Sequence, residues 1–167
     1  MQWSEYERMF EVLRRGQAGE LEAEAVRSPT FPDGVDDYLG RRWIINAIDS
    51  RCTATVQWML QKGVDLNFRD EEGYTPLHAA IDSKAPNRLD VLKLLLDAGA
   101  PVNLKGINDW TPAHQAAVRD DVEALKLLVR SGADLTIRTE IDNYATPLEE
   151  ARSVRSRNAL RYLQSVV

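Results

Sequence analysis

The stretch GYTPLHAA, residues 73–80, decides the fold, because a near copy of it, DWTPAHQAA, follows at residues 109–117. The matching pairs are Thr75 with Thr111, Pro76 with Pro112, and His78 with His114. A threonine followed by proline suits a helix N-cap and the first helical position, where the missing N–H of proline costs nothing. Both histidines of the chain lie in these two stretches, so the repetition has to be explained before either is assigned a role.

A second phrase repeats downstream of the first. VLKLLLDAGAPVN (91–103) matches ALKLLVRSGADLT (124–136), and VQWMLQKGVDLN (56–67) ends an earlier unit. The leucines give a helix its apolar stripe, and the glycine that follows suits a left-handed helix end. These glycines, Gly63, Gly99 and Gly132, recur at nearly equal intervals along the chain.

This pattern resembles the ankyrin repeat family, whose unit is about 33 residues long and contains T-P-L-H-x-A. The match is specific over residues 70–136 and weaker at both ends, where Arg42 and Trp43 replace threonine and proline and Glu149 replaces histidine. The resemblance implies an all-α solenoid of helix pairs joined by hairpin loops. The ranges expected are 1–36 (a degenerate N-terminal capping helix pair), 37–69 (a divergent repeat 1), 70–105 (repeat 2), 106–138 (repeat 3) and 139–167 (repeat 4 with the C-terminal cap).

Three local features refine this expectation. The end of a solenoid needs a polar outer face, and we expect the run Glu20, Glu22 and Glu24 to supply it. Three extra residues fall within DSKAPNRLD (82–90), where Asn87 can cap the following helix and a neutral length variation is the favoured interpretation. Two more lengthen the last hairpin, RTEIDNYATP (138–147), on the face where repeat proteins often bind.

The two histidines are expected to be structural. In ankyrin repeats the histidine of this motif ties the start of the helix to the adjacent hairpin. A catalytic or metal site would need a carboxylate or thiolate partner that recurs with the histidines, and none recurs. Nucleophile, phosphate-loop and zinc motifs are also missing from the sequence. We therefore expect no catalytic residue, no metal and no cofactor.

Composition favours a cytoplasmic protein. The 167 residues are 44% hydrophobic, which supports one core, and the net charge of −5 argues against nucleic-acid binding. Cys52 is the single cysteine and indicates a reducing compartment or indifference to redox state. The start of the chain lacks the pattern of a signal peptide, and no apolar run reaches membrane-spanning length. We expect a chain that is monomeric when unbound and does not associate with membranes.

The family resemblance also implies where a partner sits, because hairpin tips and the exposed side of the first helices form a concave protein-binding surface. By register from the motif threonines, the expected partner-binding residues are Tyr38, Leu39, Arg41, Asp49, Glu71, Glu72, Tyr74, Asp82, Ile107, Asn108, Trp110, Val118, Arg119 and Tyr144. Aromatic residues and arginine are the usual interface anchors. For Tyr74 and Trp110 two interpretations stay open, namely that the ring binds a partner or that it braces its own hairpin.

The expected function is protein binding, and because no catalytic domain accompanies the repeats, binding itself should be the activity. This favours a protein that inhibits or neutralises its partner, and an acidic N-terminal half suits a basic or partly apolar epitope. Short ankyrin proteins of this kind include bacterial toxin-immunity proteins, which we prefer, and inhibitors of cyclin-dependent kinases. A scaffold or adaptor subunit without inhibitory role is the alternative.

Overall fold

The computed structural model describes residues 3–141 and 144–167, with side chains from residue 5 onward. Ten α-helices and one 3-10 helix lie within these ranges. The helices are α1 (Trp3–Arg15), α2 (Ala18–Arg27), α3 (Trp43–Asp49), α4 (Thr53–Gln61), α5 (Pro76–Asp82), α6 (Arg88–Asp97), η1 (Ile107–Asp109), α7 (Pro112–Val118), α8 (Val122–Arg130), α9 (Pro147–Ser153) and α10 (Arg157–Val166).

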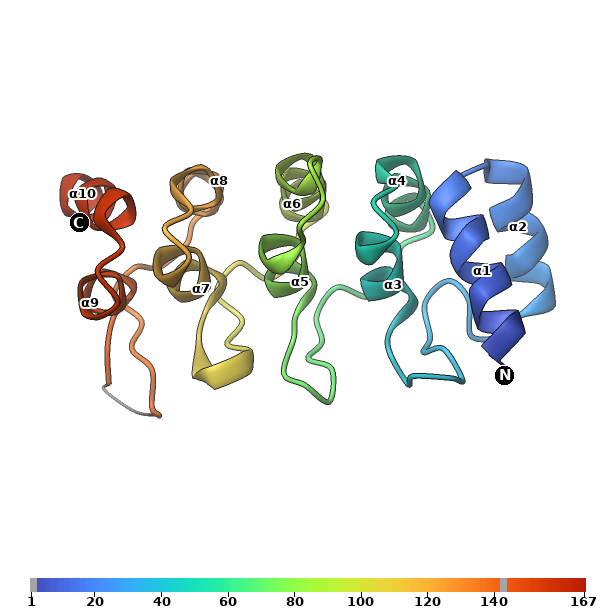
Figure 1. Cartoon of the computed structure of the whole chain (residues 1–167), viewed down its shortest axis with the longest axis horizontal. Coiled ribbons are helices and arrows are strands. Elements are labelled where there is room, and N and C mark those ends of the chain that lie inside the picture. Colours follow the sequence, from blue (N-terminus) through green and yellow to red (C-terminus); the bar gives the residue numbers. More distant parts are fainter. Residues whose placement is uncertain (1–2, 142–143) are drawn as a thin grey trace.

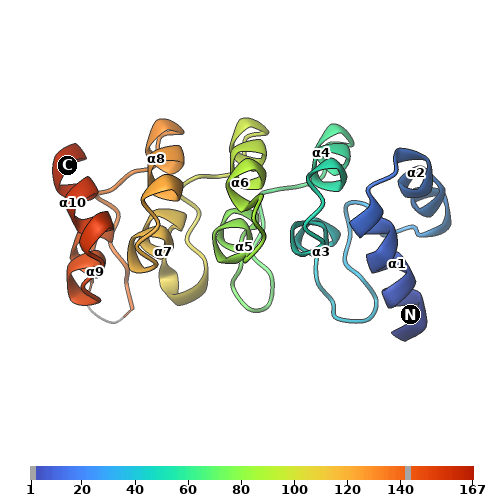
Figure 2. The same cartoon turned by 45° about the horizontal axis from the view of Figure 1, so that its top comes forward.

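The helices form five pairs that stand side by side in chain order (Figure 1). The inner helices α3, α5, α7 and α9 make one row, and the outer helices α4, α6, α8 and α10 make a second row. The loops between pairs project beyond the inner row, and the same arrangement is visible after rotation (Figure 2). The all-α solenoid predicted from the sequence is confirmed.

Threonine caps and glycine turns build each repeat as the sequence indicates. Thr75 Oγ1 accepts the backbone N–H of His78, and the same bond joins Thr146 and Glu149, each at 3.3 Å. At the ends of the outer helices, Gly63, Gly99 and Gly132 have φ values of 74°, 87° and 88°. A side chain there would meet the left-handed penalty that glycine avoids.

One hydrophobic core runs through the stack. Small residues on the inner helices, such as Ala80 and Ala117, are fully buried and let neighbouring pairs approach closely. The outer helices contribute large leucines, including Leu95 and Leu128, also fully buried. Burying one leucine stabilises the fold by about 2 kcal/mol, so each pair depends on its neighbours to cover its apolar face.

The N-terminal pair corrects one expectation, because its glutamates do not form a polar outer face. Glu22 accepts a hydrogen bond from Trp58 Nε1 at 3.1 Å and pairs with Lys62 at 2.6 Å, so it faces the next pair. Glu24 is buried and accepts two hydrogen bonds from Arg8, at 2.5 and 3.1 Å. Residues two apart on a helix point in nearly opposite directions, so alternating glutamates cannot share one face.

The long loop of repeat 2 corrects a second expectation. Five residues, 83–87, join α5 to α6, whereas three residues join the helices of the pairs α3/α4, α7/α8 and α9/α10. Asn87 precedes α6 but makes no side-chain cap. Its Nδ2 instead donates to Arg51 O at 3.0 Å and Thr53 Oγ1 at 2.6 Å, which ties this loop to the preceding pair.

Candidate protein-binding surface

The surface in question is the hairpin face, which we define as the loops that project beyond the inner helices together with the exposed sides of α3, α5 and α7. Aspartates organise the loops from inside. The buried Asp36 carboxylate accepts the N–H groups of Tyr38, Leu39 and Arg41 and the side-chain amide of Asn46. Asp70 accepts the N–H groups of Glu72 and Tyr74 at 3.1 and 2.7 Å. The loop tips are therefore held in defined conformations.

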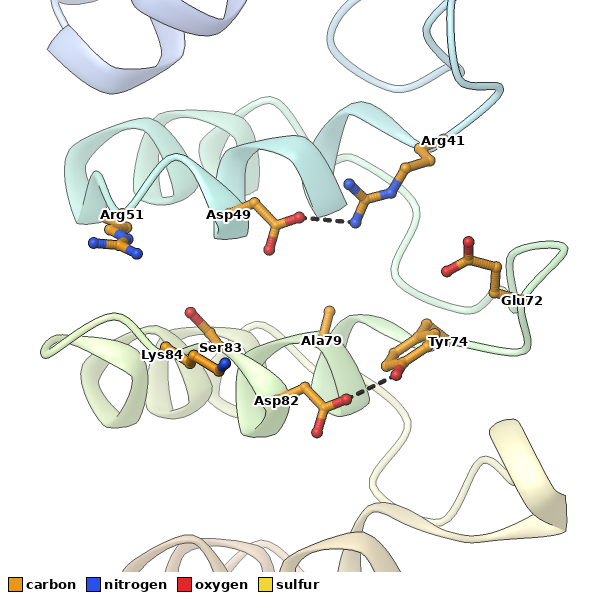
Figure 3. Close-up of a pocket in the computed structure, with 9 residues that line it drawn as sticks. All are labelled: Arg41, Asp49, Arg51, Glu72, Tyr74, Ala79, Asp82, Ser83 and Lys84. Carbon is orange, nitrogen blue, oxygen red and sulfur yellow. Dashed lines mark hydrogen bonds and ion pairs between the residues drawn. The ribbon is translucent and has the colours of Figure 1, made fainter.

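A cleft of about 460 Å³ opens on this face between α3 and α5 (Figure 3). Its lining residues are Arg41, Asp49, Arg51, Glu72, Tyr74, Ala79, Asp82, Ser83 and Lys84. Five of them were predicted as binding residues from the sequence register, namely Arg41, Asp49, Glu72, Tyr74 and Asp82. Two successive repeats thus bring their predicted positions to opposite walls of one cleft.

Several charges in the cleft are paired with each other. Arg41 Nη2 donates to Asp49 Oδ2 at 2.8 Å within repeat 1. Asp82 accepts from two residues, Tyr74 Oη at 2.8 Å and Arg119 Nη1 at 2.6 Å, so it links repeat 2 to repeat 3. The hydrogen bond to Asp82, followed by burial, raises the pKa of Tyr74 to about 12. Tyr74 is therefore fixed against its own helix, which supports the bracing interpretation for this ring.

The most exposed predicted side chains lie at the first and last hairpins. Tyr38 is 43% exposed and Leu39 50% exposed, and the Tyr38 ring lies 5.3 Å from that of Tyr6 on α1. Tyr144 is 62% exposed, with the Arg138 guanidinium 5.5 Å from its ring centre. Residues 142 and 143 of the lengthened last hairpin lie outside the described residues.

The predicted residues of the third repeat differ in exposure, and Asn108 and Arg119 are the exposed ones. Ile107 is half-buried, and its backbone packs closely against Gly73 of the neighbouring loop. Trp110 is half-buried, Val118 is half-buried, and Asn108 is exposed with a left-handed φ of 55°. The structure therefore places these residues on the hairpin face without gathering them into the cleft.

Acidic side chains are exposed at the tips. Asp37 lies beside Tyr38 in the first hairpin, and Glu71 and Glu72 project from the second. A small depression lined by Leu39, Gly40, Arg41, Asp70, Glu71 and Glu72 connects the two tips. The result is an apolar spot with an acidic border.

Both histidines hold hairpin loops in place through hydrogen bonds. His78 Nε2 lies 3.0 Å from Trp110 O, and its Nδ1 lies 2.7 Å from Thr75 Oγ1. His114 repeats the geometry with Ala145 O at 3.0 Å and Thr111 Oγ1 at 2.8 Å. A carbonyl oxygen only accepts, so Nε2 carries the proton and Nδ1 is an acceptor. Burial lowers the pKa of both imidazoles, that of His78 to about 4.

Four lining residues are not among the predicted binding residues: Arg51, Ala79, Ser83 and Lys84. Ser83 and Lys84 belong to the five-residue loop that was interpreted as a neutral length variation. The sequence shows that this loop has extra residues, but it does not show towards which side of the stack they turn. Arg51 has a left-handed φ of 64°, which no sequence pattern indicated.

Neither a metal site nor a membrane-spanning helix occurs in the part of the chain that the structure describes. Across residues 3–141 and 144–167, no group of three histidine, cysteine, aspartate or glutamate side chains is placed to hold a metal ion. Within the same ranges, no helix has the length and apolar character needed to cross a membrane.

Comparison with known proteins agrees with the geometry. The chain is 37% identical over 101 residues to BCL-6 corepressor-like protein 1 of Homo sapiens, which covers 60% of this chain and 6% of that protein. It is 33% identical over 128 residues to the B-cell lymphoma 3 protein homolog of Mus musculus, covering 76% of this chain and 28% of that protein. A putative ankyrin repeat protein of Rickettsia felis is 41% identical over 58 residues, covering 34% of this chain and 26% of that protein. The chain thus spans only a minor part of each of these relatives.

Family models cover most of the stack. A model of three ankyrin repeats matches residues 23–106, half of the chain, and a single-repeat model matches residues 108–140. Ankyrin repeats are protein-interaction modules. The chain belongs to the ankyrin repeat family.

Proposed function

We propose that this chain binds a protein partner on its hairpin face, centred on the cleft between α3 and α5. The observation that carries the proposal is the convergence of predicted binding residues from two repeats on that cleft. Its walls are helices held by the buried core, so the surface is preformed and loses little conformational entropy when a partner binds.

The partner's main contact is proposed to lie towards the N-terminal end of the face. Tyr38 and Leu39 offer exposed apolar area there, and aromatic side chains bury a large area with few rotatable bonds. Asp37, Glu71 and Glu72 border this area and favour a partner with a basic, partly apolar epitope. Tyr144 extends the same face at the other end of the stack.

Two roles for the binding are distinguished by what happens to the partner. Inhibition or neutralisation of the partner, for example of a toxin or a kinase, stays a prediction, as does the alternative of a scaffold or adaptor subunit. An assay of the captured partner's activity with and without this chain decides between them. Loss of activity at stoichiometric chain indicates inhibition, and unchanged activity indicates a scaffold.

The test of the binding face begins with capture of the partner from the native host by the immobilised chain. Calorimetric titration of variants against that partner then locates the site. We expect Tyr38→Ala or Trp110→Ala to weaken binding by about 2 kcal/mol, as expected for an anchor. Glu71→Lys should mainly slow association and reduce its salt dependence.

The matched control is Lys126→Glu on outer helix α8, a charge reversal of the same size and opposite sign on the other side of the stack. It should leave affinity nearly unchanged. If Lys126→Glu weakens binding and the hairpin variants, shown to be folded, do not, the partner sits on the outer helices and the proposal is wrong.

A further inference from the structure

One end of the cleft carries two positive side chains that face each other across it. Arg51 follows the end of α3 on one wall, and Lys84 follows the end of α5 on the other (Figure 3). Within the described part of the chain, neither side chain has a recorded hydrogen bond or ion pair. The remaining charges of the cleft differ in this respect, since Arg41 is paired with Asp49 and Asp82 is held by Tyr74 and Arg119.

The backbone does not require an arginine at position 51. Arg51, Asp120 and Arg155 occupy the same place in their repeats, directly after the inner helix, with φ values of 64°, 58° and 64°. Glycine adopts this conformation without the steric penalty that a side chain meets. Asp120 has a structural role, because its carboxylate accepts from Ala159 N at 2.7 Å and Asn158 Nδ2 at 2.8 Å in the next repeat.

Arg51 bonds to Asn87 through its backbone carbonyl, but within the described part of the chain its guanidinium makes no bond like that of the Asp120 carboxylate. Strained residues of this kind collect at functional sites. Lys84 holds the place in repeat 2 that Arg51 holds in repeat 1, and it lies in the loop that is longer in this repeat than in its neighbours. Two successive repeats therefore place a positive side chain at the same end of one cleft.

We propose that the Arg51–Lys84 end of the cleft binds an acidic side chain of the partner protein. This inference rests on the proposed function and adds which end of the cleft meets an acidic residue of the partner. Glu72 lies at the opposite, hairpin end of the cleft and borders the acidic tips. The partner segment thus lies with its acidic residue between Arg51 and Lys84 and its basic residues towards the hairpins, which fixes its direction.

The experiment is an NMR titration of the ¹⁵N-labelled full chain with the peptide hexaglutamate at constant ionic strength. Saturable shifts are expected at the amides of residues 50–52 and 83–85. Arg51→Gly should weaken the affinity about threefold or more, the range of a single exposed ion pair, and should not lower the melting temperature. Lys84→Ala should weaken it similarly.

Arg155→Gly is the matched control, because it removes the same side chain from the same left-handed conformation at a position that does not line the cleft. It should leave the titration unchanged. Equal losses from Arg155→Gly and Arg51→Gly, or shifts spread evenly over the arginines of residues 152–161, would overturn the proposal. Inorganic phosphate is the second probe, and hexaglutamate has to bind more tightly than phosphate for a peptide to be the occupant.

This test is separable from that of the proposed function. A chain that binds its captured partner through Tyr38 but gives no localised shifts with hexaglutamate keeps the proposed function and loses this inference. Localised hexaglutamate binding together with a partner seated on the outer helices would refute the proposed function alone.

Discussion

Acidification should destabilise this fold through its histidines, before its carboxylates titrate. In the unfolded chain an imidazole takes up a proton below about pH 6.5. In the folded chain burial keeps His78 neutral down to about pH 4. Between these values the unfolded state binds more protons, so the free energy of unfolding decreases as the pH falls through this window. Above about pH 6.5 the contribution of His78 is fully present and constant.

The size of the effect follows from the two pKa values of His78, about 6.5 in the unfolded chain and about 4 in the folded one. Proton linkage between these values predicts a loss of about 2 kcal/mol at about pH 5 from this one residue. The pKa of His114 is also lowered by burial, so its contribution has the same sign. The pKa of Glu24 is lowered from 4.5, so its contribution is lost only below that pH. A domain of this size therefore loses a large part of its stability between about pH 6.5 and about pH 5.

Urea unfolding followed by circular dichroism at about pH 7.5 and about pH 5 measures this loss. His78→Gln should be less stable at the higher pH, by about 1 kcal/mol, because the hydrogen bonds of the imidazole are altered. Those bonds join the ring to Thr75 and Trp110. The variant should also lose less stability than the wild type on acidification. Equal losses in both proteins, or no loss between these pH values, would show that His78 is not buried in the neutral form.

Two further predictions concern the packing around two glycines and the removal of the last helix pair. A Cβ at position 106 would lie 2.6 Å from the Gly73 carbonyl oxygen and 2.7 Å from His78 Cε1. Gly106→Ala should therefore destabilise the fold by about 2 kcal/mol, the usual cost of overpacking. Gly19 on α2 has open space around it. Gly19→Ala should stabilise the fold by about 0.5 kcal/mol through helix propensity, and thermal melts in which both changes act in the same direction would contradict the packing argument. Deleting residues 139–167 removes α9 and α10 and uncovers the apolar side of α7 and α8. The melting temperature should then fall by about 10 °C or more, and an unchanged, soluble truncation would contradict the assignment of this segment as a cap.

The repeated positions were predictable from the sequence because several weak constraints coincide at each of them. Thr75, His78 and Gly99 recur in the same order in the next repeat, so the cap, the buried imidazole and the helix end could be placed together. Positions outside the repeat pattern lack this support. Glu24 is expected at the surface from its residue type, yet it is buried because Arg8, on another helix, supplies its partner.

The candidate site likewise contains features that the sequence could place and features that it could not. Asp49 and Asp82 could be assigned to the hairpin face by register, and both line the cleft. Register could not show that Tyr74 is fixed to Asp82, because that depends on the rotamer of the ring. Nor could it show where Lys84 points, since the path of a loop with extra residues is set by what the loop contacts, here Arg51 and Thr53 through Asn87.

The residues that hold the hairpin loops in place are different from the exposed residues at the loop tips. This separation allows the hairpin face to be specific without weakening the stack. Each internal histidine reaches forward from its own threonine to a carbonyl of the next hairpin, so the loops are held by buried groups. In the last repeat Glu149 replaces the histidine, closes a capping box with Thr146 and pairs with Arg138 at 2.7 Å, so the last hairpin is held by Glu149 as well as by His114. With the backbone fixed in this manner, the tip residues can vary with little effect on folding. Arg51 and Arg155 share a left-handed conformation that glycine adopts without penalty, and of the two Arg51 lines the cleft.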